Sequence, residues 1–203
     1  MPSKKRLDEV LHLGLKEVLL LYALKEYGPI GRGRLTDVLS LPEGVTRGLL
    51  TRLQGKHYVS ADKPGCSITE KGVGVLAERL SKLQVRSIRG YEGVKLNVGP
   101  VNVAVHIGGA SGKVRLGIEE RDTVIRAGAK GAITLTYRGG VLSIPGICER
   151  LEEYRRDAWA ELMSSFDLRE GDLVLVVFAD DYWKALDGAL AVASTLTEGS
   201  TQP

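Results

Sequence analysis

Basic, hydroxyl and amide side chains recur along one face of residues 42–56, and these side chains suit contact with a nucleic acid. Arginine, threonine and glutamine all bind phosphate oxygens or base edges in DNA complexes. Val45, Leu49 and Leu53 repeat every four residues and form the expected buried stripe. The residues then expected to project from the core are Thr46, Arg47, Thr51, Arg52 and Gln54. This pattern predicts a helix that suits the major groove of duplex DNA.

Three further cations are expected to lie near that helix. Arg32 and Arg34 open a predicted helix at residues 32–39, where such residues commonly meet the DNA backbone, and Lys63 lies in the turn of a predicted hairpin. For Arg47 and Arg52, charge counting alone supports a solvated helix face equally well.

Enzymatic chemistry finds little support in the sequence. The glycine-rich segment at residues 108–113 would need a glycine at 107 and a serine or threonine at 114 to form a phosphate-binding loop for a nucleotide. Those positions hold Ile107 and Val114. A tight structural loop is therefore expected, with anion binding by its amides left open.

The histidines and cysteines form no catalytic or metal-binding pattern. His12, His57 and His106 fall in separate elements, with no nucleophile or carboxylate spaced for a triad. Cys66 and Cys148 are 82 positions apart, which indicates neither a zinc site nor a disulfide framework. We therefore expect no enzyme activity, no cofactor and no metal.

The second half of the chain contains a candidate binding site for a small-molecule effector. Arg115, Glu119 and Asp122 can share one face of a predicted helix at residues 114–127, close to the glycine-rich loop. A dense run of charges on a helix is more commonly a solvated face, and this alternative stays open.

The charge is unevenly divided along the 203 residues. Residues 1–90 carry 16 Lys+Arg against 9 Asp+Glu, a net +7, whereas residues 91–203 carry 12 against 16, a net −4. A basic half beside an acidic half indicates two domains, residues 1–84 and 85–203, of which the first binds a polyanion. No apolar run long enough for a membrane span and no signal-like segment is present, so we expect a cytoplasmic protein without membrane contact.

The first half predicts four helices and a hairpin. Helices are expected at residues 15–27, 32–39, 42–56 and 70–83, with strands at 58–62 and 66–69 around a Lys63-Pro64-Gly65 turn. The last helix carries an apolar seam that packs either within the chain or against a second subunit. Its residues are Val73, Leu76, Leu80 and Leu83.

The second half predicts an α/β domain after a linker or edge strand at residues 84–93. Strands are expected at 94–98, 101–107, 132–137, 141–144 and 173–179, and helices at 114–127, 148–166 and 182–196. A mixed sheet with helices on one or both faces buries these apolar stripes. The chain is therefore expected to be an α+β protein in which a helical N-terminal domain precedes an α/β sandwich-like domain.

Two segments of the first half resemble a known family. Residues 45–59, VTRGLLTRLQGKHYV, are similar to the recognition helix and exit of MarR- and PadR-type winged-helix regulators, and residues 67–72, SITEKG, resemble their entry to the helix after the wing. With the matching spacing, the resemblance covers about 70 residues. The wing turn is short and carries a single lysine. The whole chain resembles archaeal winged-helix regulators with an uncharacterised C-terminal α/β domain.

This resemblance implies a winged helix-turn-helix that binds double-stranded DNA, in a transcriptional regulator that forms a homodimer. The second domain is then expected to dimerise or to bind a small-molecule effector. Two alternatives remain, because the fold alone does not decide the ligand. They are a non-catalytic module that docks another protein and an RNA-binding factor.

Overall fold

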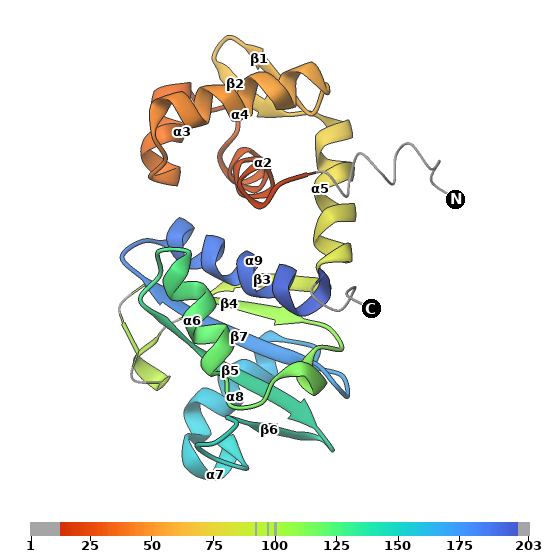
Figure 1. Ribbon diagram of the computed structural model, residues 1–203, viewed down its shortest axis with the longest axis vertical. Coiled ribbons are helices and arrows are strands. Elements are labelled where there is room, and N and C mark those ends of the chain that lie inside the picture. The colour runs from red at the N-terminus through yellow and green to blue at the C-terminus, as the bar shows by residue number, and fades with distance from the viewer. Residues whose placement is uncertain (1–12, 92, 97, 100, 199–203) are drawn as a thin grey trace, which may run out of the picture. The chain divides into compact units, whose positions relative to one another are not determined.

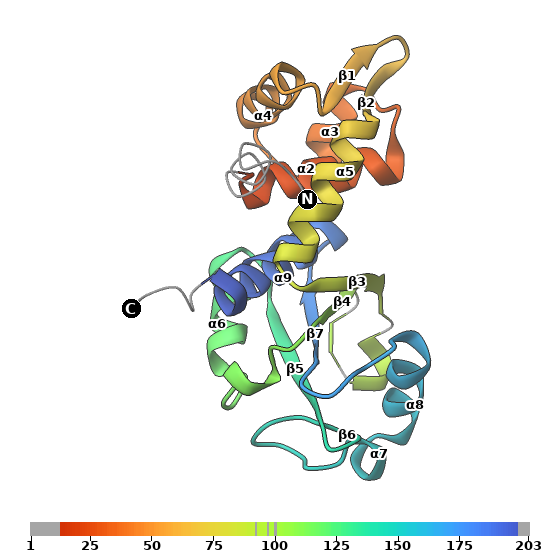
Figure 2. The same ribbon diagram turned by 90° about the vertical axis from the view of Figure 1, so that its right-hand side faces the viewer.

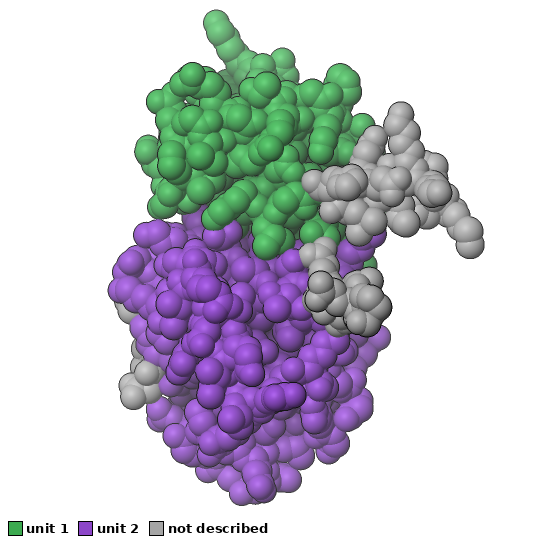
Figure 3. Space-filling view, in the orientation of Figure 1, with its two compact units in different colours: residues 1–81 green, residues 82–203 purple. Residues whose placement is uncertain are grey.

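The computed structural model describes residues 13–91, 93–96, 98–99 and 101–198. The chain divides into two compact units, residues 1–81 (unit 1) and residues 82–203 (unit 2), as the colours of Figure 3 show. The division falls three residues before the boundary that the sequence predicts.

The described part of unit 1 contains three helices, a hairpin and a further helix, in the order that the sequence predicts (Figure 1). The elements are α2 (Leu15–Tyr27), α3 (Arg32–Leu39), α4 (Glu43–Gly55), β1 (Val59–Asp62), β2 (Gly65–Ile68) and α5 (Glu70–Lys82). α2 contacts α3, α4 and β2, and α4 also contacts α3 and β1. Leu35, Leu53 and Tyr58 are among the side chains that these contacts bury almost completely.

A single-residue bridge supports the hairpin. Ile30 forms an antiparallel bridge with Cys66, and their backbones exchange two hydrogen bonds, of 3.0 and 2.8 Å. Gly65 allows this approach, because a Cβ at this position would lie 2.6 Å from the carbonyl carbon of Ile30. The hairpin is thereby fixed to the segment that joins α2 to α3.

The Thr-Glu-Lys-Gly segment fixes the start of α5. The Thr69 hydroxyl donates to the His57 carbonyl at 2.8 Å and accepts the Gly72 amide at 3.0 Å, so it caps the helix and ties it to the exit of α4. A Cβ on Gly72 would lie 2.2 Å from the carbonyl oxygen of Tyr58. The glycine is therefore required by close packing of two backbone segments.

Unit 2 is built on a five-stranded sheet with the strand order β3-β4-β7-β5-β6. Its strands are β3 (Val85–Gly90), β4 (Val101–Ile107), β5 (Gly131–Arg138), β6 (Val141–Ser143) and β7 (Leu173–Ala179). The α+β class is confirmed, but the predicted mixed sheet is wrong, because every neighbouring pair of strands is antiparallel. β4 and β5 run in the same direction, yet β7 lies between them and is antiparallel to both.

Helices cover both faces of this sheet (Figure 2). α9 (Tyr182–Glu198) contacts β4 and β7, and α6 (Ile118–Arg126) contacts β5 and α9. α8 (Arg156–Ser165) covers the opposite face, where Leu162 and Phe166 pack with Val174 and Val176 in one buried cluster. β7 is buried on both faces, which agrees with its nearly uninterrupted apolar sequence.

Three predicted elements differ from the structure. The strand predicted at 94–98 is wrong, since Gly93–Leu96 form the 3₁₀ helix η1, whereas β3 is the edge strand, one of the two alternatives for residues 84–93. The helix predicted at 148–166 is broken into α7 (Leu151–Tyr154) and α8, because Arg155 adopts φ −147 and ψ 80 between them. α6 begins only at Ile118, after Gly117 with φ 76. No helix of the described part is long and apolar enough to cross a membrane.

Gly72→Ala is expected to lower the free energy of unfolding by about 1–3 kcal/mol, because the new Cβ overpacks against the Tyr58 carbonyl. Urea unfolding followed by circular dichroism measures this change. The control is Gly48→Ala in α4, where a Cβ would meet nothing within 4 Å. This control should raise the free energy of unfolding by up to about 1 kcal/mol. Equal destabilisation of both variants would contradict the argument from close packing.

Candidate nucleic-acid interface

Helix α4 buries one side and exposes the other. Thr46 and Leu53 are fully buried, and Leu49 and Leu50 are 3% and 4% exposed. The opposite face exposes Arg47, Thr51 and Arg52, as the sequence predicts. These three side chains therefore lie on a surface that a ligand can reach.

Two residues of α4 lie on the side opposite to the one predicted. Thr46 is 0% exposed, and its hydroxyl donates to the Pro42 carbonyl at 3.4 Å, so it is no candidate for DNA contact. Val45, expected in the core, is 45% exposed. The buried stripe follows positions 46, 49, 50 and 53, with alternating steps that keep to the 3.6-residue period.

Glu43 holds two of the predicted cations together at the start of α4. Arg47 donates to Glu43 Oε1 at 2.8 Å, and Arg32 Nη2 of α3 lies 3.8 Å from the same oxygen. The hydrogen bond from Arg47 and its charge, with the charge of Arg32, lower the pKa of Glu43 below its ordinary value. All three side chains are more than half exposed.

A buried carboxylate supports Arg52. Glu17 Oε1 lies 3.5 Å from Arg52 Nε, and the Glu17 side chain is 8% exposed. The other oxygen of Glu17 accepts the Gly14 amide at 2.9 Å at the start of α2. The guanidinium of Arg52 is thus held by an ion pair at one of its nitrogens, while the Arg52 side chain stays 64% exposed.

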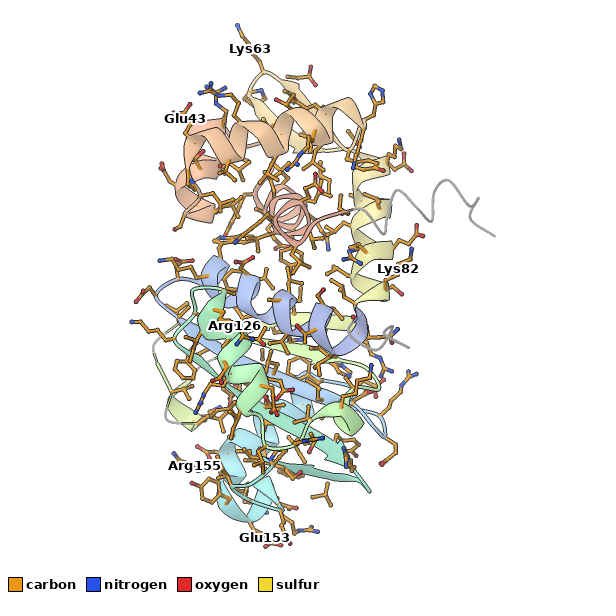
Figure 4. The ribbon with its side chains drawn as sticks, viewed as in Figure 1. Glu43, Lys63, Lys82, Arg126, Glu153 and Arg155 are labelled. Carbon is orange, nitrogen blue, oxygen red and sulfur yellow. The ribbon has the colours of Figure 1, made fainter. Side chains whose placement is uncertain are left out.

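The remaining predicted residues are spread around α4. Arg34 is exposed on α3, and Gln54 is half-buried near the end of α4. Lys63 is exposed at the tip of the hairpin, where Figure 4 shows it pointing away from unit 1. Among the described residues, Lys63 makes no hydrogen bond or ion pair.

The sequence reasoning missed a stripe of small residues on the exposed face of α4. Gly44, Gly48, Thr51 and Gly55 are all exposed and follow one another at helical spacing. A Cβ added to any of the three glycines would meet nothing within 4 Å. The backbone of α4 can therefore approach a neighbouring molecule closely between Arg47 and Arg52.

The three predicted effector residues are not brought together. Arg115 is exposed before α6, Glu119 is exposed in its first turn, and Asp122 forms an ion pair of 3.0 Å with Arg121. No described hydrogen bond or ion pair joins the three. Glu120 is the residue that turns inward, and burial raises its pKa.

Asp172 organises a polar cluster of unit 2 that no sequence pattern revealed. Its carboxylate, fully buried, accepts hydrogen bonds from Arg86 at 2.6 Å and His106 at 2.7 Å. It also accepts the backbone amides of Gly109 and Arg169, both at 2.9 Å. Burial alone raises the pKa of Asp172, but the hydrogen bonds from His106 and the two amides lower it below its ordinary value overall.

The glycine-rich loop uses its amides for this internal network. The Gly109 amide binds Asp172, and the Ser111 amide donates to the Gly171 carbonyl at 2.9 Å. Arg138 donates to the hydroxyl and carbonyl oxygens of Ser111. The loop is therefore held by hydrogen bonds to other residues of unit 2, as expected for a structural loop. The described residues contain no group of three or more His, Cys, Asp or Glu that could hold a metal, and His12 lies outside them.

Comparisons with known proteins add one extended similarity. Residues 98–196 match a family described as a domain of unknown function (DUF4443). The chain is similar to the structure of hypothetical protein PH0730 from Pyrococcus horikoshii OT3, with 26% identity, a TM-score of 0.69, and coverage of 92% of this chain and 95% of that one. HmgR of Pseudomonas aeruginosa aligns over 91% of this chain and 97% of its own at 13% identity, but its TM-score of 0.29 is too low to indicate a shared fold. A search of curated proteins found no match. The match to the Pyrococcus protein therefore extends over both units.

Proposed function

We propose that this protein is a DNA-binding transcriptional regulator in which α4 lies in the major groove of duplex DNA. The observation that carries the proposal is the one-sided burial of α4, which leaves Arg47, Thr51 and Arg52 exposed together. Arg32 and Arg34 of α3 and Lys63 of the hairpin supply further exposed cations in the same unit. This combination suits a winged helix, whose recognition helix reads bases while neighbouring cations bind phosphates.

The small residues of α4 support this placement. Glycine in a helix interior lowers helix stability by about 1 kcal/mol relative to alanine. Gly48 lies in the middle of α4 and has no packing reason to be glycine, since a Cβ there would meet nothing within 4 Å. Binding in a DNA groove would explain a glycine at this position, because the helix axis can lie deeper in the groove when the side chains that face the groove floor are small.

The ion pairs around Glu43 make the interface ready for phosphate. Arg47 and Arg32 already converge on one carboxylate oxygen, so their guanidinium groups are held close together before any DNA binds. A DNA phosphate carries the same kind of oxygen acceptor and can take the place of Glu43. The exchange releases counterions from DNA, so affinity should fall steeply with salt.

The two alternatives fit the exposed face of α4 less well. A protein-docking surface is expected to present several apolar side chains, whereas Val45 is the exposed large hydrophobic residue of α4. Double-stranded RNA has a deep and narrow major groove that does not admit a helix. Single-stranded RNA is recognised largely by stacking on aromatic side chains, and α4 contains none.

The proposal includes a homodimer, because two copies of α4 would read a palindromic site. The seam of α5 offers little free surface for this contact, since Leu76 and Leu83 are buried, and Val73, 41% exposed, is the seam residue with the most accessible side chain. Unit 2 exposes more: Leu116 and Ile147, 58% and 66% exposed, line one groove of about 310 Å³ beside β5. We therefore place the contact with a second copy at this groove.

Arg47→Ala is expected to weaken binding to a fluorescent random-sequence duplex about tenfold, because one phosphate or base contact is lost. The slope of log affinity against log salt should become shallower by about one. Anisotropy titrations at several salt concentrations measure both. Arg126→Ala is the matched control, since it removes an exposed arginine of unit 2.

Three results would count against the assignment. They are equal loss in the Arg47 and Arg126 variants, affinity for the duplex that does not change with salt, and tighter binding of single-stranded RNA than of duplex. Absence of nucleic-acid binding would favour the protein-docking module.

Glu43→Gln should tighten duplex binding by up to about fivefold, because the anion that competes with phosphate for Arg47 and Arg32 is removed. The matched control is Glu153→Gln. Glu153, labelled in Figure 4, is an exposed glutamate of unit 2. It pairs with Arg150 at 2.7 Å. The same anisotropy titration at low salt measures the change. Weaker binding by the Glu43 variant would show that Glu43 supports the interface and would contradict the exchange.

The double variant Leu116→Asp and Ile147→Asp should convert a dimer to a monomer, because four carboxylates would face one another across the contact. Light scattering of the purified protein measures the mass. Val73→Asp is the comparison, and it should leave the dimer intact. A monomeric Val73 variant beside a dimeric double variant would instead place the contact on the α5 seam, and a monomeric wild-type protein would overturn the dimer.

A further inference from the structure

A second pocket of unit 2, the arginine pocket, lies between the edge strand β3 and the segment that follows α8. Its volume is about 350 Å³, which lies within the range of roughly 300–1,000 Å³ typical of small-molecule sites. The residues that line it are Arg86, Ser87, Arg89, His106, Ser165, Phe166, Asp167 and Arg169. None of these residues belongs to the candidate nucleic-acid interface.

The arginine pocket carries an excess of positive charge. Arg86, Arg89 and Arg169 supply three guanidinium groups, and the carboxylate among the lining residues is Asp167. That carboxylate is 90% exposed and lies 3.6 Å from Arg169, so it is well solvated and screened. Within the described part of the chain, Arg89 has no hydrogen bond or ion pair. Its charge is available to a ligand.

Arg86 is held in place by the buried carboxylate of Asp172. Its Nη1 donates to Asp172 at 2.6 Å, and a Cβ on Gly108 would lie 2.5 Å from its Nε, so the guanidinium packs directly on the glycine backbone. The Arg86 side chain remains 39% exposed. A guanidinium fixed at one nitrogen loses little further freedom when it binds a second acceptor.

His106 lines the arginine pocket beside Asp172. Its ring is 3% exposed and lines the pocket, and Nε2 lies 2.7 Å from Asp172. An ionised carboxylate only accepts hydrogen bonds, so Nε2 carries the proton and donates it. The same bond fixes the orientation of the His106 ring at the base of the pocket.

We propose that the arginine pocket binds a small oxyanion with at least two negative charges, such as a phosphate ester or a polycarboxylate. The guanidinium groups match the paired oxygens of either ligand. The Ser87 and Ser165 residues lining the pocket add hydroxyl groups, and the Phe166 ring offers an apolar wall for the carbon part of the ligand. The role of this ligand as an effector rests on the proposed function, whereas its binding does not.

Calorimetric titration of the full chain with inorganic phosphate and, separately, with citrate tests the proposal at constant ionic strength and without DNA. At least one of the two should bind saturably with one site per chain. Arg89→Ala and Arg169→Ala should each weaken that binding at least about tenfold. Arg126→Ala, in α6 on the opposite face of the sheet, should change it by less than about twofold. Melting temperatures confirm that the variants fold.

Each other result overturns the proposal. If neither anion gives a saturable heat of binding, the pocket does not bind this class of ligand. If all three variants weaken anion binding equally, the binding reflects general charge attraction and no specific site. If Arg89→Ala weakens duplex binding as much as anion binding, the pocket contacts DNA phosphates and holds no separate small ligand. Because the titration contains no DNA, its failure leaves the α4 interface untouched, and failure of the α4 interface leaves this result standing.

Discussion

The buried stripe of α4 is the constraint on which the rest of unit 1 depends. Leu49, Leu50 and Leu53 pack on one side of this helix, and burial of each contributes roughly 1.5–3 kcal/mol. Its three glycines oppose helix formation by about 1 kcal/mol each. The free energy from packing therefore exceeds the cost of the glycines, and packing determines both that the helix forms and which side of it faces the core. Because one side of α4 must face the core, Arg47, Thr51 and Arg52 must face away from it.

Periodicity and turn residues predicted each helix and strand that the structure describes between residues 13 and 82, but they missed the rotation of α4 by one position. A simple division into apolar and polar residues places valine inside and threonine outside. Thr46 defeats this division, because its hydroxyl bonds to a carbonyl of its own helix turn and the residue can then be buried. In unit 2, the sequence left residues 84–93 open between a linker and an edge strand, because an edge strand such as β3 can expose residues such as Arg86 and Arg89. The position of β7 between β4 and β5 depends on long-range pairing, which no local pattern encodes.

The cluster around Asp172 could not be predicted for the same reason. Its hydrogen-bond donors come from positions 86, 106, 109 and 169, which the sheet and its loops bring together. Burying a carboxylate is unfavourable unless several donors satisfy it, and here four do. The same bonds fix Arg86 and His106 against the base of the arginine pocket. Cationic groups held by a structural carboxylate are thus already in place for an anion, and binding need not order them.

A ligand in the arginine pocket would act on the strand that directly continues the last helix of unit 1. Only Leu83 and Gln84 separate α5 from β3, and both are constrained: Leu83 is fully buried, and the Gln84 carbonyl accepts the Gly108 amide at 2.8 Å. Gln84 adopts φ 54, a left-handed conformation that is unfavourable for a residue with a side chain. Coupling requires two arrangements with different ligand affinities. The proposed ligand contacts Arg86 and Arg89 of β3, so the conformations of Leu83 and Gln84 are the ones to compare between free and ligand-bound protein.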